Sequence, residues 1–265
     1  RRPPGSTLFP YTTLFRSYFL PKALWLARHE PARYAASRYL ISCPELVALS
    51  LCGEAVTMLH TDAFRAYYWD EEILSKLGLG AERFPRFVRP GEVLGPLRSE
   101  AAARLGLPPS IPVVAGGADF LMSLLGTATV LPGRGCDRAG SSEGINVCAA
   151  SEVRPPGLLC HPHLVPPYWN VSGMVPASGL AVAWLRRALG AEGGSYDEFF
   201  AALAAVPPGA RGLRFRPFGG AGGEGELVGL TLRHGPAEMA RAVVDAVGVA
   251  IRRILRSIGE AGVPV

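Results

Sequence analysis

Asp119 is the residue in this sequence whose type and setting point most directly to chemistry. It follows a short apolar run at residues 111–115 and the pair Gly116 and Gly117. Active sites in α/β folds lie at the carboxyl ends of buried strands, and small residues there let a ligand approach the backbone closely. A carboxylate in this position can act as a general base. It can also act only as the N-cap of the following helix, and the residues alone leave both roles open.

A second candidate is the glycine- and serine-rich segment 140–144, which lies between two predicted strands. Backbone N–H groups and hydroxyls in such a turn can bind phosphate. Glycine and serine are also common in ordinary tight hairpins. The segment is neither a P-loop nor a dinucleotide fingerprint, so taken alone it favours an ordinary hairpin over a phosphate site. The glycine run at 219–225 also has two interpretations, a ligand-binding loop and a flexible surface loop, and the surface loop is favoured.

These candidates must be positioned by alternating helices and strands. Helices are predicted at residues 22–28, 32–39, 44–51, 71–77, 100–105, 120–125, 179–189, 197–204 and 237–258. Strands are predicted at 111–115, 136–139, 145–149, 211–218 and 227–231, the first of them buried on both faces. Asp70, Ser99 and Ser178 are expected to cap helices. The alternation indicates an α/β architecture, and the end of the sequence just after a long helix indicates truncation.

The first 17 residues are predicted to be non-native, because residues 7–17 read as the in-frame translation of a DNA-sequencing adapter. The formal charge of the whole chain is +5, and it falls to +2 without that segment, which holds three arginines and no acid. The remaining basic residues are scattered, whereas a nucleic-acid-binding protein concentrates them on one face. We therefore expect no nucleic-acid partner.

The cysteine pattern indicates a reducing compartment. Five cysteines show no paired spacing, so free thiols and a cytoplasmic location are expected. The Cys-His-Pro-His segment at 160–163 lacks a second ligand pair and is predicted to be a loop, with no metal site. Residues 111–131 are apolar, but Asp119 in their middle would cost about 2.5–3.5 kcal/mol inside a bilayer. A strand, a turn and a helix explain this stretch better than a membrane span.

Several segments, taken in order, resemble the FGGY carbohydrate kinases. Residues 20–26 resemble the family's Pro-Lys-x-x-Trp-Leu helix, and residues 51–57 its Leu-Thr-Gly-Glu segment. Residues 69–77 resemble Trp-x-x-Glu-Leu-Leu, residues 91–95 match Gly-Glu-x-x-Gly, and residues 112–119 resemble the block that holds the catalytic aspartate. Each segment is weak alone, but the ordered set is fairly specific and the resemblance extends from residue 20 to 265.

The resemblance implies an α/β, actin-like ATPase (RNase H-like) two-domain fold that is truncated here at both ends. Residues 18–133 would be the C-terminal portion of the sugar-binding domain, and residues 134–265 the N-terminal portion of the ATP-binding domain. The implied activity is ATP-dependent phosphorylation of a sugar, with Mg²⁺, and family frequency makes a ketopentose such as xylulose the first expectation. The implied partner is a small-molecule sugar, and a homodimer is left open.

The resemblance also implies roles for single residues. Asp119 would be the general base at the cleft between the domains, and it would contact the sugar together with Phe120. Many members have Asn or Gln after the aspartate, so Phe120 points to an unusual sugar. The nucleotide would be bound by the family's phosphate hairpin and by a helix start, at Gly140, Ser141, Ser142 and Gly179. Ser141 replaces the family's usual Thr and keeps the hydroxyl.

Two family motifs are absent from this sequence, the N-terminal Asp-x-Gly-Thr and the C-terminal glycine-rich adenosine motif. The chain by itself is therefore expected to be inactive, and no metal ligand is assigned to it. The alternative function is a non-catalytic actin-like protein that binds nucleotide, which would have no need of a base at Asp119. A nicotinamide-dependent enzyme would need a glycine fingerprint and a ribose-binding acid that the sequence lacks.

Overall fold

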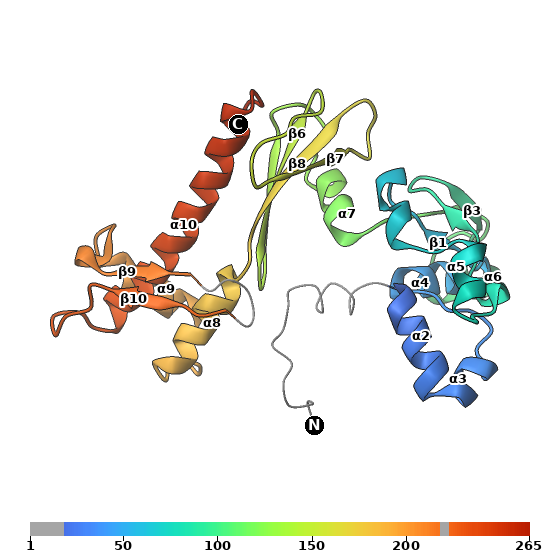
Figure 1. The fold of residues 1–265 in the computed structure, drawn as a ribbon, viewed down its shortest axis with the longest axis horizontal. Helices are drawn as coiled ribbons and strands as arrows, with labels where there is room; N and C mark the ends of the chain where they lie inside the picture. Colours follow the sequence, from blue (N-terminus) through green and yellow to red (C-terminus); the bar gives the residue numbers. More distant parts are fainter. Residues whose placement is uncertain (1–18, 218–222) are drawn as a thin grey trace. The chain divides into compact units, whose positions relative to one another are not determined.

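The computed structural model of the protein describes residues 19–217 and 223–265, and the chain divides into two compact units. Unit 1 ends at Met122 and unit 2 comprises Ser123–Val265, so the division falls inside helix α7 (Asp119–Gly126). Figure 1 labels most of the helices and strands of each unit. The domain boundary expected after residue 133 remains a prediction about the family's domains.

Unit 1 mixes short helices with two pairs of short strands. Its helices are α2 (Phe19–His29), α3 (Pro31–Ala36), α4 (Cys43–Cys52), α5 (Glu71–Lys76) and α6 (Ser99–Leu105), with 3-10 turns at Asp62–Tyr67 and Ala81–Arg83. Its strands are β1 (Thr57–Met58), β2 (Phe87–Val88), β3 (Val93–Pro96) and β4 (Pro112–Val114). β1 pairs with β2 in parallel, and β3 pairs with β4 antiparallel.

Helix α4 shows how local signals and a buried charge build unit 1. It begins with a capping box in which the Glu45 carboxylate accepts the Ser42 N–H at 2.6 Å. The other Glu45 oxygen accepts the N–H of Met58 in β1 at 2.7 Å. Glu45 is only 4% exposed, and both of its carboxylate oxygens have backbone partners. One carboxylate thus fastens the start of α4 to β1.

Two apolar clusters hold unit 1 together. One packs helix α4 against β1, β2 and β3, and it consists of Ala48, Val56, Met58, Val88, Leu94 and Ala115. The other lies around α2 and α5, and it consists of Ala23, Trp69, Leu74, Leu79 and Phe84. The first cluster includes Ala115, the residue that follows β4, and so fixes the point from which the chain turns toward Asp119.

The prediction that strand 111–115 is buried on both faces was wrong. β4 pairs only with β3, and the side chain of Val114 is 51% exposed. The apolar run is explained by Ala115, which is 3% exposed within the first cluster, rather than by a central strand.

Unit 2 is a four-stranded antiparallel sheet followed by helices and a second, two-stranded sheet. The large sheet has the order β5-β6-β8-β7, with β5 (Gly135–Ala139), β6 (Glu143–Ala149), β7 (Leu159–Pro162) and β8 (Trp169–Val175). The remaining elements are α8 (Ser178–Ala188), α9 (Tyr196–Ala204), a 3-10 turn at Ala210–Gly212, β9 (Arg214–Arg216), β10 (Glu226–Val228) and α10 (Pro236–Glu260). β9 and β10 pair antiparallel.

Helix α10 connects the two parts of unit 2, as Figure 1 shows in red. Near its start, Ala240, Ala242 and Val243 pack into a cluster with side chains of α8, α9 and β9. Near its end, Ile258 packs against Val147 and other side chains of β6 and β8. A helix of 25 residues, about 37 Å long at 1.5 Å per residue, is long enough to serve both cores.

Several sequence expectations for unit 2 and for the caps need correction. Residues 160–163 are not a loop, because Leu159–Pro162 forms β7, and β8 was not predicted. Ser99 and Ser178 are the first residues of α6 and α8 and do not cap them with their side chains, whereas Asp70 caps α5 by accepting the Ile73 N–H at 2.7 Å. The glycine run 219–225 lies largely outside the described residues.

No helix in the described ranges 19–217 and 223–265 combines the length and the apolar character needed to cross a bilayer. All five cysteines are free thiols.

Candidate functional site

Asp119 lies where the ends of three strands of unit 1 come together. β1 and β2 run in parallel, and the chain continues from them to His60 and Pro90. Beyond β4, Ala115 accepts the N–H of Gly91 at 2.9 Å and donates its own N–H to Glu92 at 2.8 Å. The carboxyl ends of β1, β2 and β4 therefore lie at one edge of unit 1, the place where α/β folds position their sites.

The turn that precedes Asp119 is tightly packed. A Cβ atom added to Gly117 would lie 3.1 Å from Met122 Cε, 3.4 Å from Pro90 Cγ and 3.5 Å from His60 Nδ1. The N–H of Ala118 donates to His60 Nδ1 at 3.1 Å, and its carbonyl accepts the N–H groups of Leu121 and Met122 at 3.0 Å. The turn is thus held from both sides, and Asp119 follows it directly.

Asp119 is the first residue of α7 rather than the residue before it. Its side chain is exposed, and Oδ1 accepts the N–H of Phe120 at 2.6 Å. The carboxylate therefore satisfies one of the first-turn N–H groups, as expected of a cap, although from inside the helix. A proton acceptor at this position is open to a ligand while its backbone is fixed.

Aromatic rings line one side of the Asp119 turn. The Phe64 ring lies 5.8 Å from the His60 ring, edge-on, and 6.4 Å from the ring of Phe120, centroid to centroid. Phe120 is half-buried, so part of its ring remains open beside the carboxylate. The structure thus brings together Asp119 and Phe120, the two residues expected to contact a sugar, and adds His60 and Phe64.

His60 has a perturbed pKa for an identifiable reason. Burial lowers the pKa of its imidazole below the usual value, and the nearby charge of Asp119 acts in the opposite direction. The net direction is downward, so the ring is neutral at pH 7. A neutral ring that accepts at Nδ1 carries its proton on Nε2.

The second candidate site is the hairpin that joins β5 to β6 in unit 2. The carbonyl of Gly140 accepts the N–H of Gly179 at 3.2 Å, and the carbonyl of Ser141 accepts the N–H of Leu180 at 3.1 Å. Gly179 must be glycine, because an added Cβ would lie 2.2 Å from the Gly140 oxygen. The expected residues Gly140, Ser141 and Gly179 are therefore in direct contact.

This contact decides which hairpin groups remain available. The C=O and N–H of a trans peptide point in opposite directions, and the carbonyls of Gly140 and Ser141 point at α8. The N–H groups of Ser141 and Ser142, which belong to the same two peptides, consequently point away from the helix. Successive N–H groups on one side of a turn form a concave site for an anion. The hairpin thus fits a phosphate, with the exposed Ser141 hydroxyl beside it.

The chain matches known proteins along almost its whole length. The N-terminal domain of the FGGY family of carbohydrate kinases matches residues 5–126. The xylulose kinase of Escherichia coli K12 is 24% identical over 266 residues, which cover 94% of this chain and 54% of that protein. The crystal structure of xylulose kinase from Rhodospirillum rubrum, 28% identical, superposes with a TM-score of 0.72 over 93% of this chain and 53% of that one.

Residues 5–126 thus match a domain of the FGGY carbohydrate kinases, and the chain as a whole is similar to kinases of that family. It spans about half the length of the curated relatives it matches. The glycerol kinase of Plasmodium falciparum, only 13% identical, has the same fold with a TM-score of 0.69 over 98% of this chain. The expected actin-like α/β fold is thereby confirmed, whereas the roles of the single residues stay predictions.

The buried carboxyl group of Glu143 was not anticipated from the sequence. Glu143, at the start of β6, is 7% exposed and lies beside Asp137 of β5 and Ser178 of α8. Burial raises the pKa of Glu143, the neighbouring Asp137 raises it further, and Ser178 acts in the opposite direction. The base of the β5–β6 hairpin thus contains a carboxyl group that binds a proton more tightly than an ordinary glutamate does.

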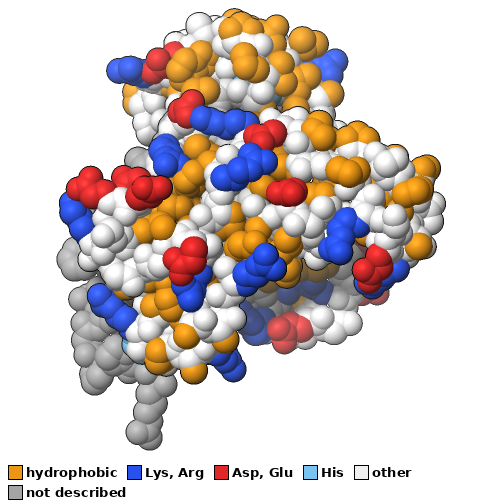
Figure 2. Space-filling model, turned by 90° about the vertical axis from the view of Figure 1, so that its right-hand side faces the viewer, with side chains coloured by type: hydrophobic (Ala, Val, Ile, Leu, Met, Phe, Trp, Pro, Cys, Tyr) orange, Lys and Arg blue, Asp and Glu red, His pale blue; other side chains and the backbone are white. Residues whose placement is uncertain are grey.

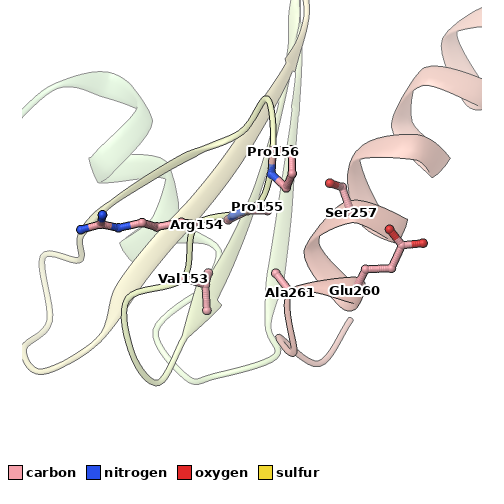
Figure 3. Close-up of a pocket in the computed structure, with 7 residues that line it drawn as sticks. All are labelled: Val153, Arg154, Pro155, Pro156, Ser257, Glu260 and Ala261. Atoms are coloured by element: carbon pink, nitrogen blue, oxygen red, sulfur yellow. The ribbon is translucent and has the colours of Figure 1, made fainter.

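The described residues of unit 2 also line two cavities away from these sites. One, of about 300 Å³, is lined by residues 153–156, after β6, and by Ser257, Glu260 and Ala261 at the end of α10, as Figure 3 shows. A larger one, of about 960 Å³, lies between β9 and α10 and is mainly apolar. Neither is lined by Asp119 or by the hairpin, and neither gathers the groups that phosphoryl transfer needs.

Charged side chains do not form a single field on the face drawn in Figure 2, where Lys and Arg lie among Asp, Glu and apolar side chains. Several charged side chains of the described residues form exposed ion pairs, such as Arg86 with Glu92 at 2.7 Å.

His60 and Glu143 are the site residues that sequence reasoning missed. The contact between His60 and Ala118 joins positions 58 residues apart, and a lone histidine after a short strand carries no pattern. Glu143 lies within the segment 140–144 that was singled out, but its burial depends on α8.

Proposed function

We propose that the complete protein transfers the γ-phosphoryl group of ATP to a hydroxyl group of a sugar. The proposal is supported by the match of residues 5–126 to the FGGY family and by relatives that are xylulose kinases and a gluconokinase. A ketopentose such as xylulose is the first substrate to test, because several of the matched proteins are xylulose kinases. We expect the enzyme to work in the cytoplasm, where ATP is available.

The observation that carries the proposal is the setting of Asp119, an exposed carboxylate on a fixed turn at the converging strand ends. A sugar hydroxyl is a poor nucleophile until a base accepts its proton. In the proposed step, Asp119 accepts that proton while the hydroxyl oxygen bonds to the γ-phosphorus. The bond from the γ-phosphorus to the bridging oxygen breaks and ADP leaves. The half-buried ring of Phe120 would offer an apolar surface to the sugar.

The hairpin of unit 2 would bind the nucleotide. The N–H groups of Ser141 and Ser142 and the Ser141 hydroxyl would donate hydrogen bonds to its phosphates, and Gly179 would let the hairpin lie against α8. Mg²⁺, when bound with ATP, would neutralise phosphate charge. Among the described residues no cluster of three or more His, Cys, Asp or Glu side chains could hold a metal ion, so we assign Mg²⁺ no ligand here.

The test is sugar-dependent release of ADP by the complete protein, measured over a panel of ketoses, aldoses, polyols and sugar acids. Asp119→Asn keeps the size of the side chain and removes the base, so kcat should fall by roughly 10²–10⁴-fold for the preferred sugar. Asp70→Asn is the matched control, because asparagine caps a helix about as well as aspartate and Asp70 caps α5. It should leave kcat unchanged.

Two results would contradict the proposal. Turnover by Asp119→Asn within a few-fold of the parent would remove Asp119 as the base. Tight ATP binding with no sugar-dependent ADP release on any member of the panel would favour the non-catalytic nucleotide-binding alternative.

A further inference from the structure

His60 is the side chain that fixes the turn before Asp119. Its Nδ1 atom accepts the N–H of Ala118 at 3.1 Å, and it lies 3.5 Å from the point where a Gly117 side chain would begin. The carbonyl of Ala118 is bound by the N–H groups of Leu121 and Met122 in α7. Both polar groups of Ala118 are therefore engaged, one by His60 and one by the helix.

We propose that His60 is a positioning residue for Asp119, holding the turn through the hydrogen bond from the Ala118 N–H to its neutral imidazole. The inference rests on the proposed role of Asp119 as the base. A base that is misplaced by about 1 Å loses much of its rate advantage, so a contact one residue away from Asp119 can control turnover without touching the substrate.

The contact exists in only one protonation state of His60. An imidazolium carries N–H groups on both nitrogens and cannot accept the Ala118 N–H. Among the described charged groups, Asp119 is the one whose charge acts on His60, and it favours the imidazolium. Phe64, Pro90 and Met122, which also pack around the turn, are uncharged. Burial outweighs the charge of Asp119 and keeps the pKa of His60 below its usual value.

Unit 2 contains a second histidine in a comparable setting. His163 Nδ1 accepts the N–H of Val165 at 3.0 Å, and its Nε2 lies 3.0 Å from the carbonyl oxygen of Thr129. Burial lowers the pKa of His163 as well. Both histidines thus accept a backbone N–H at Nδ1, and His60 is the one that lies in the same unit as Asp119.

Two substitutions distinguish the role of His60 as a hydrogen-bond acceptor from the effect of its protonation. In His60→Asn, the amide oxygen takes the place of Nδ1, so the acceptor is kept and the protonation is lost. In His60→Leu, both are lost. His163→Asn is the control for the loss of a buried histidine, and all variants are made in the complete protein.

The first measurement is hydrogen exchange of peptides that cover residues 116–122, which does not depend on kinase activity. We expect exchange at Ala118 to become several-fold faster in His60→Leu and to remain near the parent rate in His60→Asn and His163→Asn. Equal exchange in the parent and His60→Leu would overturn the contact itself.

The second measurement is the pH profile of kcat on the sugar found above. We expect kcat of His60→Leu to fall by roughly ten- to a hundredfold with little change in KM for ATP, and kcat of His60→Asn to lie within a few-fold of the parent. The parent should lose kcat as the pH falls through the lowered pKa of His60, and His60→Asn should lack that decrease. An unchanged acid limb in His60→Asn would overturn the positioning role, even if His60→Leu failed to fold.

The outcomes also separate this inference from the proposed function. If Asp119→Asn keeps its turnover, the base assignment fails, while the exchange data still report on the His60 contact. If Asp119→Asn is inactive and His60→Leu keeps the parent kcat, the base stands and His60 has no positioning role.

Discussion

The Asp119 turn of unit 1 and the β5–β6 hairpin of unit 2 are both glycine-rich, and both meet the start of a helix. They are fixed by different groups. A side chain, His60, holds the Asp119 turn, whereas the hairpin is held by two backbone hydrogen bonds from α8, where Gly179 leaves no space for another atom. The hydrogen bond to His60 can be kept by an isosteric side chain and depends on pH, because imidazole titrates. The hydrogen bonds between the hairpin and α8 join backbone groups, so they do not depend on the side chain or on its protonation.

The difference predicts that the hairpin is the less tolerant of the two. In Gly179→Ala, the new Cβ would lie 2.2 Å from the Gly140 carbonyl oxygen, and backbone cannot move away as a flexible side chain can. We expect a loss of roughly 1–3 kcal/mol from overpacking. Thermal unfolding of the complete protein measures this loss, at about 2–4 °C per kcal/mol for a domain of this size.

Gly248→Ala is the matched control for that substitution. Gly248 lies inside α10 with nothing within 4 Å of an added Cβ, so alanine there should raise stability by up to about 1 kcal/mol through helix propensity. The comparison between the two sites breaks down if Gly179→Ala is as stable as Gly248→Ala, because the hairpin would then not depend on close backbone contact.

A smaller effect is expected at Glu143, the buried carboxyl group at the base of the hairpin. Its pKa is raised, so the folded state binds a proton more tightly than the unfolded state does. Stability should therefore fall as the pH rises from the ordinary glutamate pKa through the raised value. Glu143→Gln removes the charge and should be more stable than the parent at pH 7–8, with the difference vanishing near pH 4.

Unfolding midpoints between pH 4 and 8 test this effect, with the exposed Glu192→Gln as a control that should follow the parent throughout. If Glu143→Gln destabilises the protein at pH 8, the carboxylate itself holds the hairpin to α8. Side chains would then matter at both sites, and the contrast between them would be weaker.

The parts of this structure that the sequence predicted are those with local causes. Asp70 caps α5 through a residue three positions away, as predicted. The helix predicted at residues 44–51 is likewise local, since it ends at Gly53, which adopts the left-handed conformation with φ of 85° without strain. The strand β8 was missed because it pairs along its whole length with β6, which is not its neighbour in sequence, and β7 in turn pairs with β8. Strand order is a non-local property that apolar patterns do not encode.

The residues of the candidate site also fall into those that the sequence could predict and those that it could not. Asp119 and the hairpin could be singled out because glycines mark them, and the resemblance to the FGGY family gave them roles. His60 could not, because its partner Ala118 lies 58 positions away. The requirement for glycine at position 179 comes from its close contact with the Gly140 carbonyl, which the sequence does not indicate.

The smallest effect on stability is expected for Ser141→Ala. Ser141 contacts α8 through its carbonyl, which accepts the Leu180 N–H at 3.1 Å, and alanine keeps that carbonyl. The side chain is exposed, so the unfolding free energy should change by no more than about 0.5 kcal/mol. Binding should respond differently, because a hydrogen bond to a charged phosphate contributes about 1.5–3 kcal/mol, and KM for ATP should rise roughly tenfold or more.

Ser151→Ala, at an exposed position after β6, is the control that should change neither quantity. A drop in stability in Ser141→Ala as large as that in Gly179→Ala would show that the serine hydroxyl, and not the backbone, fastens the hairpin. An unchanged KM for ATP with unchanged stability would leave the backbone contact in place but remove Ser141 from the nucleotide site. Only the combination of intact stability and weakened ATP binding supports a hairpin whose carbonyls hold the helix while its opposite side binds phosphate.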